Sequence, residues 1–394
     1  MFLRSRFTVA IPQSKLEIAM SNPCTHQQDG TGSPTNLRHV AVVDPGSSVL
    51  PFDYYFCRSL IDRGERVTLL ASHTQYNVEF LSELAREDKA HVELWRISST
   101  VANRAIGILN YLRMLTFLLV NLRKFDVVYY NFPKGWLLES IIFRILGHKA
   151  VFCIHNAVPH GFEAKRHLGT RALASSAHRL LFVSAWTKSD FVSRYGPTYE
   201  NLSDVMQHGI IGIDPLDSPQ SYQLCESFCG VAFWGNIKPY KGVEVFRLLP
   251  KDWLPKAVDK RYLIAGKWDH DLSHLRDEYK ARNEIDLHDG FLTRESVKDL
   301  LAQDYIFLLP YRQASQSGIL YTLLFYGRYF IGTDRGDIGD FLRTNGLEKL
   351  IIDDLSEGEM RRAIGWLMEN LSDVQAKLVS AQQSYTWQWG DKVA

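Results

Sequence analysis

The stretch with the clearest chemistry is residues 233–242, which read FWGNIKPYKG. It follows an apolar, strand-like run, and its lysines, Lys238 and Lys241, place two positive charges in a short loop. Residues 243–249 then have the pattern of a helix, whose first unpaired N–H groups would suit a phosphate. Gly235 would let a ligand approach the backbone closely. The alternative is an ordinary surface loop with two solvated lysines.

A second loop of the same kind lies further along the chain, at residues 315–318, which read SQSG. It stands between a predicted strand, 305–309, and a predicted helix, 319–326. Two hydroxyls beside a helix N-terminus form a second potential anion site. On its own, Ser317 is better explained as a plain helix N-cap. Together, however, the two loops supply the several donors that a diphosphate requires.

The elements that must position these loops alternate between short apolar strands and amphipathic helices. This alternation predicts two parallel α/β sheets, one in each half of the chain. We predict a disordered tail at 1–37, a first Rossmann-like domain at 38–212, a second at 213–375, and a C-terminal helix at 376–394 that returns to the first domain. The predicted strands are 39–43, 66–71, 91–95, 125–130, 150–154, 180–183, 231–234, 261–265, 285–288, 305–309 and 329–332.

In open α/β sheets, ligands bind beyond the carboxyl ends of the strands. We therefore expect the polar residues at those ends to line one cleft between the two domains. From the first half these are Asp44, Gly46, Ser47, Asn131, His155 and Asn156. From the second half they are Gly235, Asn236, Lys238, Lys241, Gly266, Tyr311, Ser315, Gln316, Ser317 and Gly318.

His155 and Glu163 are the candidates for proton transfer in the first half. His155 directly follows an apolar strand and could bind a hydroxyl or move a proton, although a purely structural histidine fits the pattern too. Glu163 follows closely in sequence and could act as a general base. Asp44 is the third candidate for that role.

The long apolar segment at 103–124 predicts a helix. Polar residues interrupt it before it reaches about 18 consecutive apolar residues, so we do not expect it to span a membrane. It is either a core helix or an interfacial helix with a basic edge.

Composition excludes several classes of protein. The net charge of +1 and a pI near 7.7 argue against a general nucleic-acid binder. Five scattered cysteines form no CxxC pair of the zinc-binding type, and together with the lack of a signal-like segment they indicate reduced thiols in the cytoplasm. Neither a Walker loop nor a G-x-G-x-x-G after the first strand is present, and we expect no metal. Met20 is an alternative start.

The motifs taken together resemble the GT-B glycosyltransferases of the family 4 type. The similarity is carried by FWGNIKPYKG, by the DGFLT that begins at Asp289, by LPYRQ, by the Gln-Ser-Gly helix start and by the IHNxxPH that begins at Ile154. Within that group the chain looks most similar to the mannosyltransferase of xanthan assembly, in glycosyltransferase family 94. The resemblance spans about residues 38 to 390.

The resemblance implies two facing Rossmann-like domains, the second holding a GDP- or UDP-hexose as co-substrate, with no other cofactor. Lys241 matches the lysine that holds the donor diphosphate, and His155 matches a histidine near the donor sugar. Asn236 stands where many members have an arginine, so Lys238 would supply that charge. The chain lacks the family's pair of glutamates spaced by seven residues. The corresponding positions fall at or near Ser315 and at Thr322 or Leu323.

The resemblance leads us to expect a transferase that moves a mannose- or glucose-type hexose onto a lipid-linked oligosaccharide in bacterial exopolysaccharide or cell-surface glycan synthesis. Such an enzyme would be cytoplasmic, in peripheral contact with the inner face of the plasma membrane. Two alternatives stay open. One is a non-catalytic GT-B partner subunit, which the missing carboxylates would fit, and the other is a sugar-nucleotide epimerase.

Overall fold

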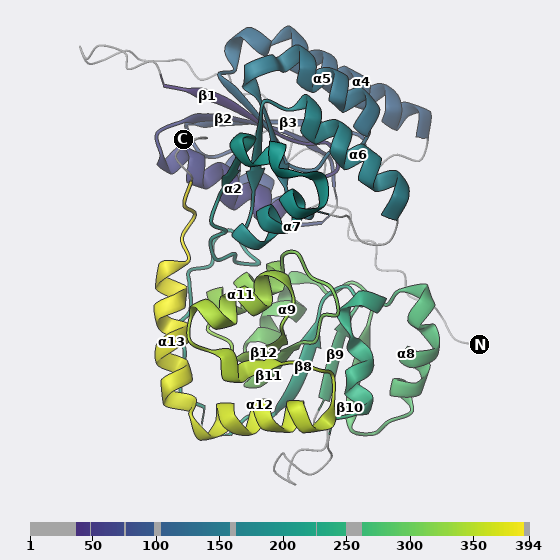
Figure 1. The fold of residues 1–394 in the computed structure, drawn as a ribbon, viewed down its shortest axis with the longest axis vertical. Coiled ribbons are helices and arrows are strands. Elements are labelled where there is room, and N and C mark those ends of the chain that lie inside the picture. The colour runs from purple at the N-terminus through teal and green to yellow at the C-terminus, as the bar shows by residue number, and fades with distance from the viewer. Residues whose placement is uncertain are drawn as a thin grey trace. The chain divides into compact units, whose positions relative to one another are not determined.

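The computed structural model describes residues 37–47, 49–74, 76–97, 104–157, 163–225, 227–249 and 262–389, without the side chains of 163–166 (Figure 1). Apart from Leu37, the tail predicted to be disordered lies outside the described residues.

The first sheet has seven parallel strands in the order β3-β2-β1-β4-β5-β6-β7. Its strands are apolar runs buried on both faces, as parallel sheets covered by helices require. The strand order reverses at β1, which pairs with both β2 and β4. The strands are β1 (His39–Asp44), β2 (Arg66–Ser72), β3 (Ala90–Trp95), β4 (Val127–Tyr130), β5 (Ala150–Ile154), β6 (Arg179–Phe182) and β7 (Ser203–Val205).

Helices cover both faces of this sheet. One apolar cluster joins the sheet to α2 (Leu50–Asp62) and α3 (Val78–Leu84), through residues such as Phe56 and Phe80. The other cluster joins the opposite face to the remaining helices, which are α4 (Arg104–Val120), α5 (Trp136–Leu146), α6 (Glu163–Ser176) and α7 (Ala185–Tyr195). The polar interruptions of α4 therefore fall on a helix that packs one face against a core.

The second sheet repeats the arrangement with six parallel strands in the order β10-β9-β8-β11-β12-β13. Its order reverses at β8, which pairs with both β9 and β11. The strands are β8 (Gly230–Trp234), β9 (Tyr262–Gly266), β10 (Ile285–Asp289), β11 (Tyr305–Leu309), β12 (Phe330–Thr333) and β13 (Ile351–Ile352). The helices are α8 (Ser273–Lys280), α9 (Arg294–Leu301), α10 (Gly318–Phe325), α11 (Gly336–Thr344), α12 (Glu357–Glu369) and α13 (Leu371–Ser384). The predicted class, two Rossmann-like α/β domains, is confirmed.

The prediction of a helix at 243–249 is wrong. The chain instead forms two short 3-10 helices, Pro239–Lys241 and Val243–Arg247, separated by Gly242 at φ +67°. The left-handed glycine turns the backbone so that Val243, Val245 and Phe246 enter the core. The loop therefore has no α-helix N-terminus to offer a phosphate.

The C-terminal segment also differs in its bounds from the predicted helix at 376–394. Helix α13 begins earlier, at Leu371, and ends at Ser384, after which residues 385–389 are no longer helical. Gln388 forms an antiparallel bridge with Gln207, and the Trp389 ring packs edge-on against Phe56 and Tyr129 of the first sheet's core. The return to the first half is thus made by residues 385–389, which follow the helix.

Within the part of the chain that the structure describes, no helix combines the length and the apolar character needed to cross a bilayer.

Candidate functional site

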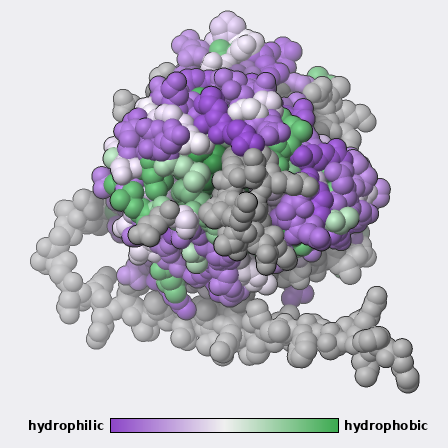
Figure 2. Space-filling model, turned by 90° about the horizontal axis from the view of Figure 1, so that it is seen from below, coloured by the Kyte–Doolittle hydropathy of each residue, from purple (hydrophilic) through white to green (hydrophobic). Residues whose placement is uncertain are grey.

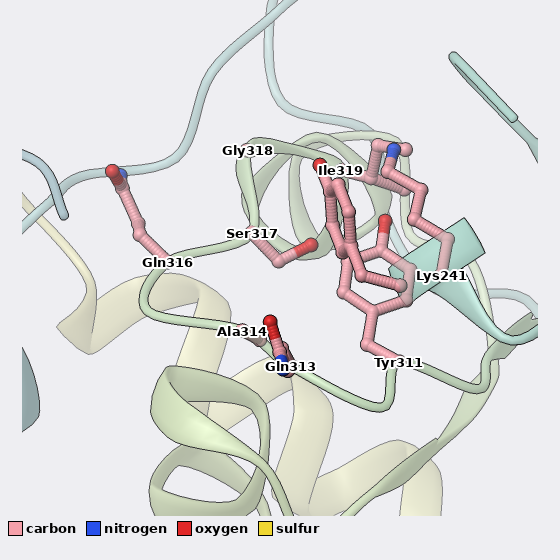
Figure 3. Close-up of a pocket in the computed structure, with 9 residues that line it drawn as sticks. Lys241, Tyr311, Gln313, Ala314, Gln316, Ser317, Gly318 and Ile319 are labelled. Carbon is pink, nitrogen blue, oxygen red and sulfur yellow. The ribbon is translucent and has the colours of Figure 1, made fainter. Parts of the chain in front are cut away.

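A pocket opens at the carboxyl end of the second sheet, where the strand order reverses. The loops that follow β8 and β11 form it, which is the position where open α/β sheets bind ligands. Its lining residues are Tyr240, Lys241, Tyr311, Gln313, Ala314, Gln316, Ser317, Gly318 and Ile319 (Figure 3). The two loops singled out in the sequence therefore meet in one pocket.

Lys241 is the main electrostatic feature of the pocket. Its side chain is 8% exposed, and among the described residues it forms no ion pair. The Nζ atom lies 5.2 Å from the centroid of the Tyr311 ring and 6.0 Å from that of Phe233, so only aromatic faces compensate its charge. Burial lowers the pKa of Lys241. A buried ammonium without a counter-charge is costly, and an anionic ligand would remove that cost.

Ser317 brings the start of α10 to the same pocket. It is the N-cap of this helix, and its Oγ accepts from the Leu320 N–H at 3.4 Å. In Figure 3 the Ser317 side chain points toward the side of the pocket where Lys241 and Tyr311 lie, whereas Gln316 points away from them. The cap occupies the Leu320 N–H, whereas the N–H groups of Gly318 and Ile319 before it have no partner within the helix, so they can bind an anion.

Tyr311 completes the wall between these two groups. Its side chain is almost fully buried, and burial raises the pKa of its hydroxyl, an effect that a hydrogen bond with Ser317 partly offsets. The hydroxyl therefore stays neutral and can donate to a phosphate oxygen.

Two glycines allow the strand ends behind Lys241 to approach each other. A Cβ on Gly235 would lie 3.5 Å from the Lys241 Nζ, and a Cβ on Gly266 would lie 1.8 Å from the Gly235 carbonyl oxygen. A Cβ at Gly266 would require a backbone shift, whereas one at Gly235 would displace the end of the Ile319 side chain, 2.7 Å away, and strain a backbone at φ +120°. Gly235 and Gly266 thus shape the floor near the lysine and donate no side chain to the pocket.

Three further predicted donor residues lie outside the pocket lining. Asn236 is exposed. Lys238 is half exposed and forms an ion pair of 2.6 Å with Asp269, so its charge is already balanced. Ser315 is buried, and its carbonyl accepts from the Asp337 N–H at 3.3 Å. Of the two lysines in the loop, only Lys241 is therefore available to a ligand in the pocket.

The positions of the missing glutamates offer no replacement carboxylate from α10. Thr322 donates its hydroxyl to the Gly318 carbonyl, and Leu323 is buried in the core. A carboxyl that the sequence did not reveal, Asp337, accepts from the Tyr321 hydroxyl beside the turn at residues 314–315. Burial raises the pKa of Asp337 to about 7. Its proximity to this turn follows only from the long-range packing of α10 against α11.

The carboxyl ends of β1 and β4 gather the predicted polar residues of the first half. Asp44 and Asn131 are both buried there, and Asp44 Oδ1 accepts from the Gly46 N–H at 2.8 Å. Ser47 adopts φ +48°, and its Oγ both donates to the Ser72 carbonyl and accepts from the Ser72 N–H, each at 2.7 Å. These contacts hold the loop after β1 close to the carboxyl end of the strand.

His155 lies beside this group, at the end of β5. Its ring stacks on Phe132 at 4.2 Å and meets Phe52 edge-on. Burial lowers the pKa of His155 to about 3. A hydrogen bond with the Gln316 side chain raises this pKa and so offsets part of the effect of burial. The ring is therefore neutral at physiological pH, and its Nε2 is buried without a hydrogen-bond partner in the described structure. These features suit a hydrogen bond to a ligand hydroxyl.

Asn156 follows His155 and is partly exposed. Glu163 is the first residue of α6, and its side chain lies outside the described part of the structure. Its role as a base stays a prediction, as does the expected absence of a metal. Among the described residues, no three potential metal ligands gather at one point.

Comparison with known proteins supports the resemblance read from the motifs. Residues 54–210 match the family model described as Glycosyltransferase Family 4. No curated protein matches the sequence significantly.

Solved structures match over nearly the whole chain. HepE of Anabaena, solved with UDP and glucose, is 14% identical, with a TM-score of 0.59 over 88% of this chain and 94% of that one. WaaG, a glycosyltransferase involved in lipopolysaccharide biosynthesis, is 13% identical, with a TM-score of 0.55 over the same shares of the two chains. The catalytic domain of starch synthase IV from Arabidopsis thaliana, solved with ADP and acarbose, is 11% identical, with a TM-score of 0.60 over 89% of this chain and 96% of that one. The fold is therefore GT-B, and the matched domain model supports the prediction of a glycosyltransferase.

Proposed function

We propose that this protein transfers a mannose- or glucose-type hexose from GDP- or UDP-hexose to a lipid-linked oligosaccharide, in bacterial exopolysaccharide or cell-surface glycan synthesis. The observation that carries the proposal is the buried ammonium of Lys241, which has no described counter-charge and lines one pocket with the start of α10. A sugar diphosphate would supply the missing negative charge. HepE, which shares the fold, was solved with UDP and glucose.

Catalysis would follow from charge stabilisation at this pocket. When the bond between the anomeric carbon and the diphosphate breaks, negative charge grows on the leaving phosphate, where Lys241 and the N–H groups of α10 can stabilise it. The acceptor hydroxyl forms the new glycosidic bond and loses its proton. The neutral His155 ring would hold a sugar hydroxyl through its unpartnered Nε2.

If the reaction inverts the anomeric configuration, a base must take the acceptor proton. With a pKa of about 3, His155 is a weak proton acceptor, and Asp44 is fully buried and engaged by Gly46. We therefore favour Glu163 among the three predicted candidates.

Two measurements on the full chain test the proposal. Titration calorimetry with UDP-glucose, GDP-mannose, UDP and GDP should show micromolar to millimolar binding of at least one donor and its matching nucleotide. Incubation of that donor, radiolabelled, with a bacterial lipid extract should then label a lipid. The absence of binding to every donor would refute the proposal.

The same measurements separate the alternatives. The absence of the family's carboxylates at or near Ser315 and at Thr322 or Leu323 would also fit a non-catalytic partner subunit, which would label no lipid. An epimerase would convert the donor to another sugar nucleotide without any acceptor, and chromatography of the reaction would show this.

Contact with a membrane is supported by the surface formed by α4 and α5, which we call the α4–α5 face. Leu137, Ile141 and Ile145 on α5 are spaced by four residues and are more than half exposed, so they share one stripe of the helix. The exposed apolar residues of the α4–α5 face are Ile106, Ile108, Leu109, Leu112, Val120, Trp136, Leu137, Ile141 and Ile145. By contrast, the face seen from below in Figure 2 is mainly hydrophilic, with a smaller hydrophobic area.

The charges around the α4–α5 face complement an anionic lipid surface. Between residues 104 and 149 the only acidic residues are Asp126 and Glu139, and Glu139 is fully buried. The basic residues of this segment are Arg104, Arg113, Arg123, Lys124, Lys134, Arg144, His148 and Lys149. An exposed apolar stripe flanked by basic residues is typical of a surface that lies in the headgroup region of a bilayer.

Vesicle binding tests this contact. The chain should co-sediment with phosphatidylglycerol vesicles, less at high salt, and bind phosphatidylcholine vesicles weakly. The double variant Ile141→Glu/Ile145→Glu should lower the partition coefficient about tenfold or more, since two apolar side chains no longer insert. Met368→Glu, at an exposed position on α12, is the matched control and should bind as the unmodified chain does. Equal loss in both variants would count against the α4–α5 face.

A further inference from the structure

Two carboxyl groups lie side by side, fully buried, where β1 ends and α2 begins. Asp44 and Asp53 both have zero exposure, and their side chains are within hydrogen-bond contact of each other. The Asn131 amide donates to Asp53 Oδ1 at 2.9 Å, and the Gly46 N–H donates to Asp44 Oδ1 at 2.8 Å. In the described structure, no donor reaches Asp53 Oδ2.

None of the described groups that act on the pKa of Asp53 is positively charged. Lys134, in the loop after β4, interacts electrostatically with Asp44, but the Lys134 side chain is exposed to solvent. The other titratable groups that face Asp53 are the thiols of Cys57 on α2 and Cys153 on β5, and burial raises the pKa of both. Two adjacent carboxylates in such a site cannot both be ionised at reasonable cost.

We propose that Asp53 is a protonated acid that donates to Asp44, and that this pair positions the loop after β1 on the acceptor side of the site. A proton on Asp53 Oδ2 makes this atom, which otherwise lacks a hydrogen-bond partner in the described structure, a donor. One negative charge then remains, on Asp44, and the hydrogen bond from the Gly46 N–H stabilises it. Burial and the Asp44 charge also raise the pKa of Asp53 well above its usual range, against the opposing hydrogen bond from Asn131.

The anchored loop shows why the pair would matter. Residues 44–47 hold Ser47 at φ +48°, a conformation that costs energy for a residue with a Cβ and persists only where its surroundings enforce it. Asp44 fixes one end of this turn through Gly46, and Ser72 fixes the other through Ser47. Asp53 is thus a positioning residue for the end of β1, and this role rests on the proposed transferase function.

Infrared spectroscopy tests the shared proton without any substrate. At pH 7 the full chain should show the carbonyl band of a protonated carboxyl group that is lost in Asp53→Asn. Asp62→Asn, at an exposed position on the same helix, is the control and should keep the band. If the spectra of the unmodified chain and Asp53→Asn superpose in this region, the proposal is wrong.

The pH dependence of unfolding gives a second test. Because the pKa of Asp53 is raised on folding, the folded chain holds one more proton than the unfolded chain at pH values between the ordinary pKa and the raised one. Stability is then fully present below the ordinary pKa and falls as pH rises through that window. Asp53→Asn cannot titrate and should lose this slope. The same slope in both proteins would contradict the shared proton.

Transfer kinetics test the positioning role. Asp53→Asn keeps a donor to Asp44 and an acceptor for Asn131, so its KM for the lipid extract should stay within about twofold of the unmodified value. Asp53→Leu, of similar volume, should raise this KM about tenfold and leave the donor dissociation constant unchanged. Equal effects of the two substitutions on KM, or a weaker donor affinity in Asp53→Leu, would refute the positioning role.

If Asp53→Leu fails to fold, the infrared and unfolding tests on Asp53→Asn still decide whether Asp53 is protonated. A failure of the proposed function itself would appear separately, as no donor binding by the unmodified chain.

Discussion

Replacing Lys241 with alanine is expected to weaken the binding of UDP- or GDP-hexose by about 2 to 3 kcal/mol, roughly 30- to 150-fold in dissociation constant. The ammonium is buried against two aromatic rings and has no described carboxylate partner, so its charge is fully available to a diphosphate. The loss of affinity should be similar for the free nucleoside diphosphate, because it carries the same negative charge. It should be much smaller for the free sugar or the nucleoside, because neither of them carries a phosphate. Titration calorimetry measures all four.

Lys238→Ala is the matched control for this prediction. It removes the same side chain from the same loop, three residues earlier, but Lys238 is exposed and paired with Asp269. Exposed ion pairs contribute little, so donor affinity should change by less than about threefold. Comparable losses of donor affinity in the two variants would indicate that the loop attracts the donor by its general positive charge, and that Lys241 does not bind the diphosphate specifically.

Gly266→Ala is expected to destabilise the chain by about 3 kcal/mol or more, and donor binding should be lost with the distorted pocket. The new Cβ would lie 1.8 Å from the Gly235 carbonyl oxygen, so the ends of β8 and β9 would have to move apart. Gly235 in turn adjoins the Lys241 Nζ, which couples the clash to the pocket. The midpoint of denaturant unfolding, followed by tryptophan fluorescence, reports the loss.

Gly290→Ala separates the clash from backbone strain. Gly290 also has a positive φ, +138°, but no atom lies within 4 Å of its potential Cβ. This substitution should cost only about 1 kcal/mol, and donor binding should persist. A chain with Gly266→Ala that unfolds no earlier than one with Gly290→Ala would show that the two strand ends can separate freely.

The sequence alone was enough to predict the two parallel sheets and the strand ends that carry the site. Buried parallel strands need continuous apolar runs, and the turns after them need glycine, proline and polar residues, so both signals are local. For this reason Lys241 and Ser317, 76 residues apart, could be assigned to one pocket before their positions were known.

Tertiary structure decided which of the predicted residues are free to act. Lys238 meets an aspartate 31 residues away, whereas the turn at Gly242 directs the next lysine into the pocket. The same turn replaced the predicted helix with 3-10 helices, because burial of Val243 and Phe246 outweighed their local helical pattern.

The protonation states also lay beyond the sequence. Asp44 was predicted as a strand-end residue of the cleft and a candidate base, yet it is fully buried against Asp53, a residue that no motif singled out. His155 is held neutral by the aromatic rings around it. Burial and charge pairing depend on atoms brought together from distant parts of the chain, so residue type and spacing determined where the site lies, and only packing determined which of its groups carry charge.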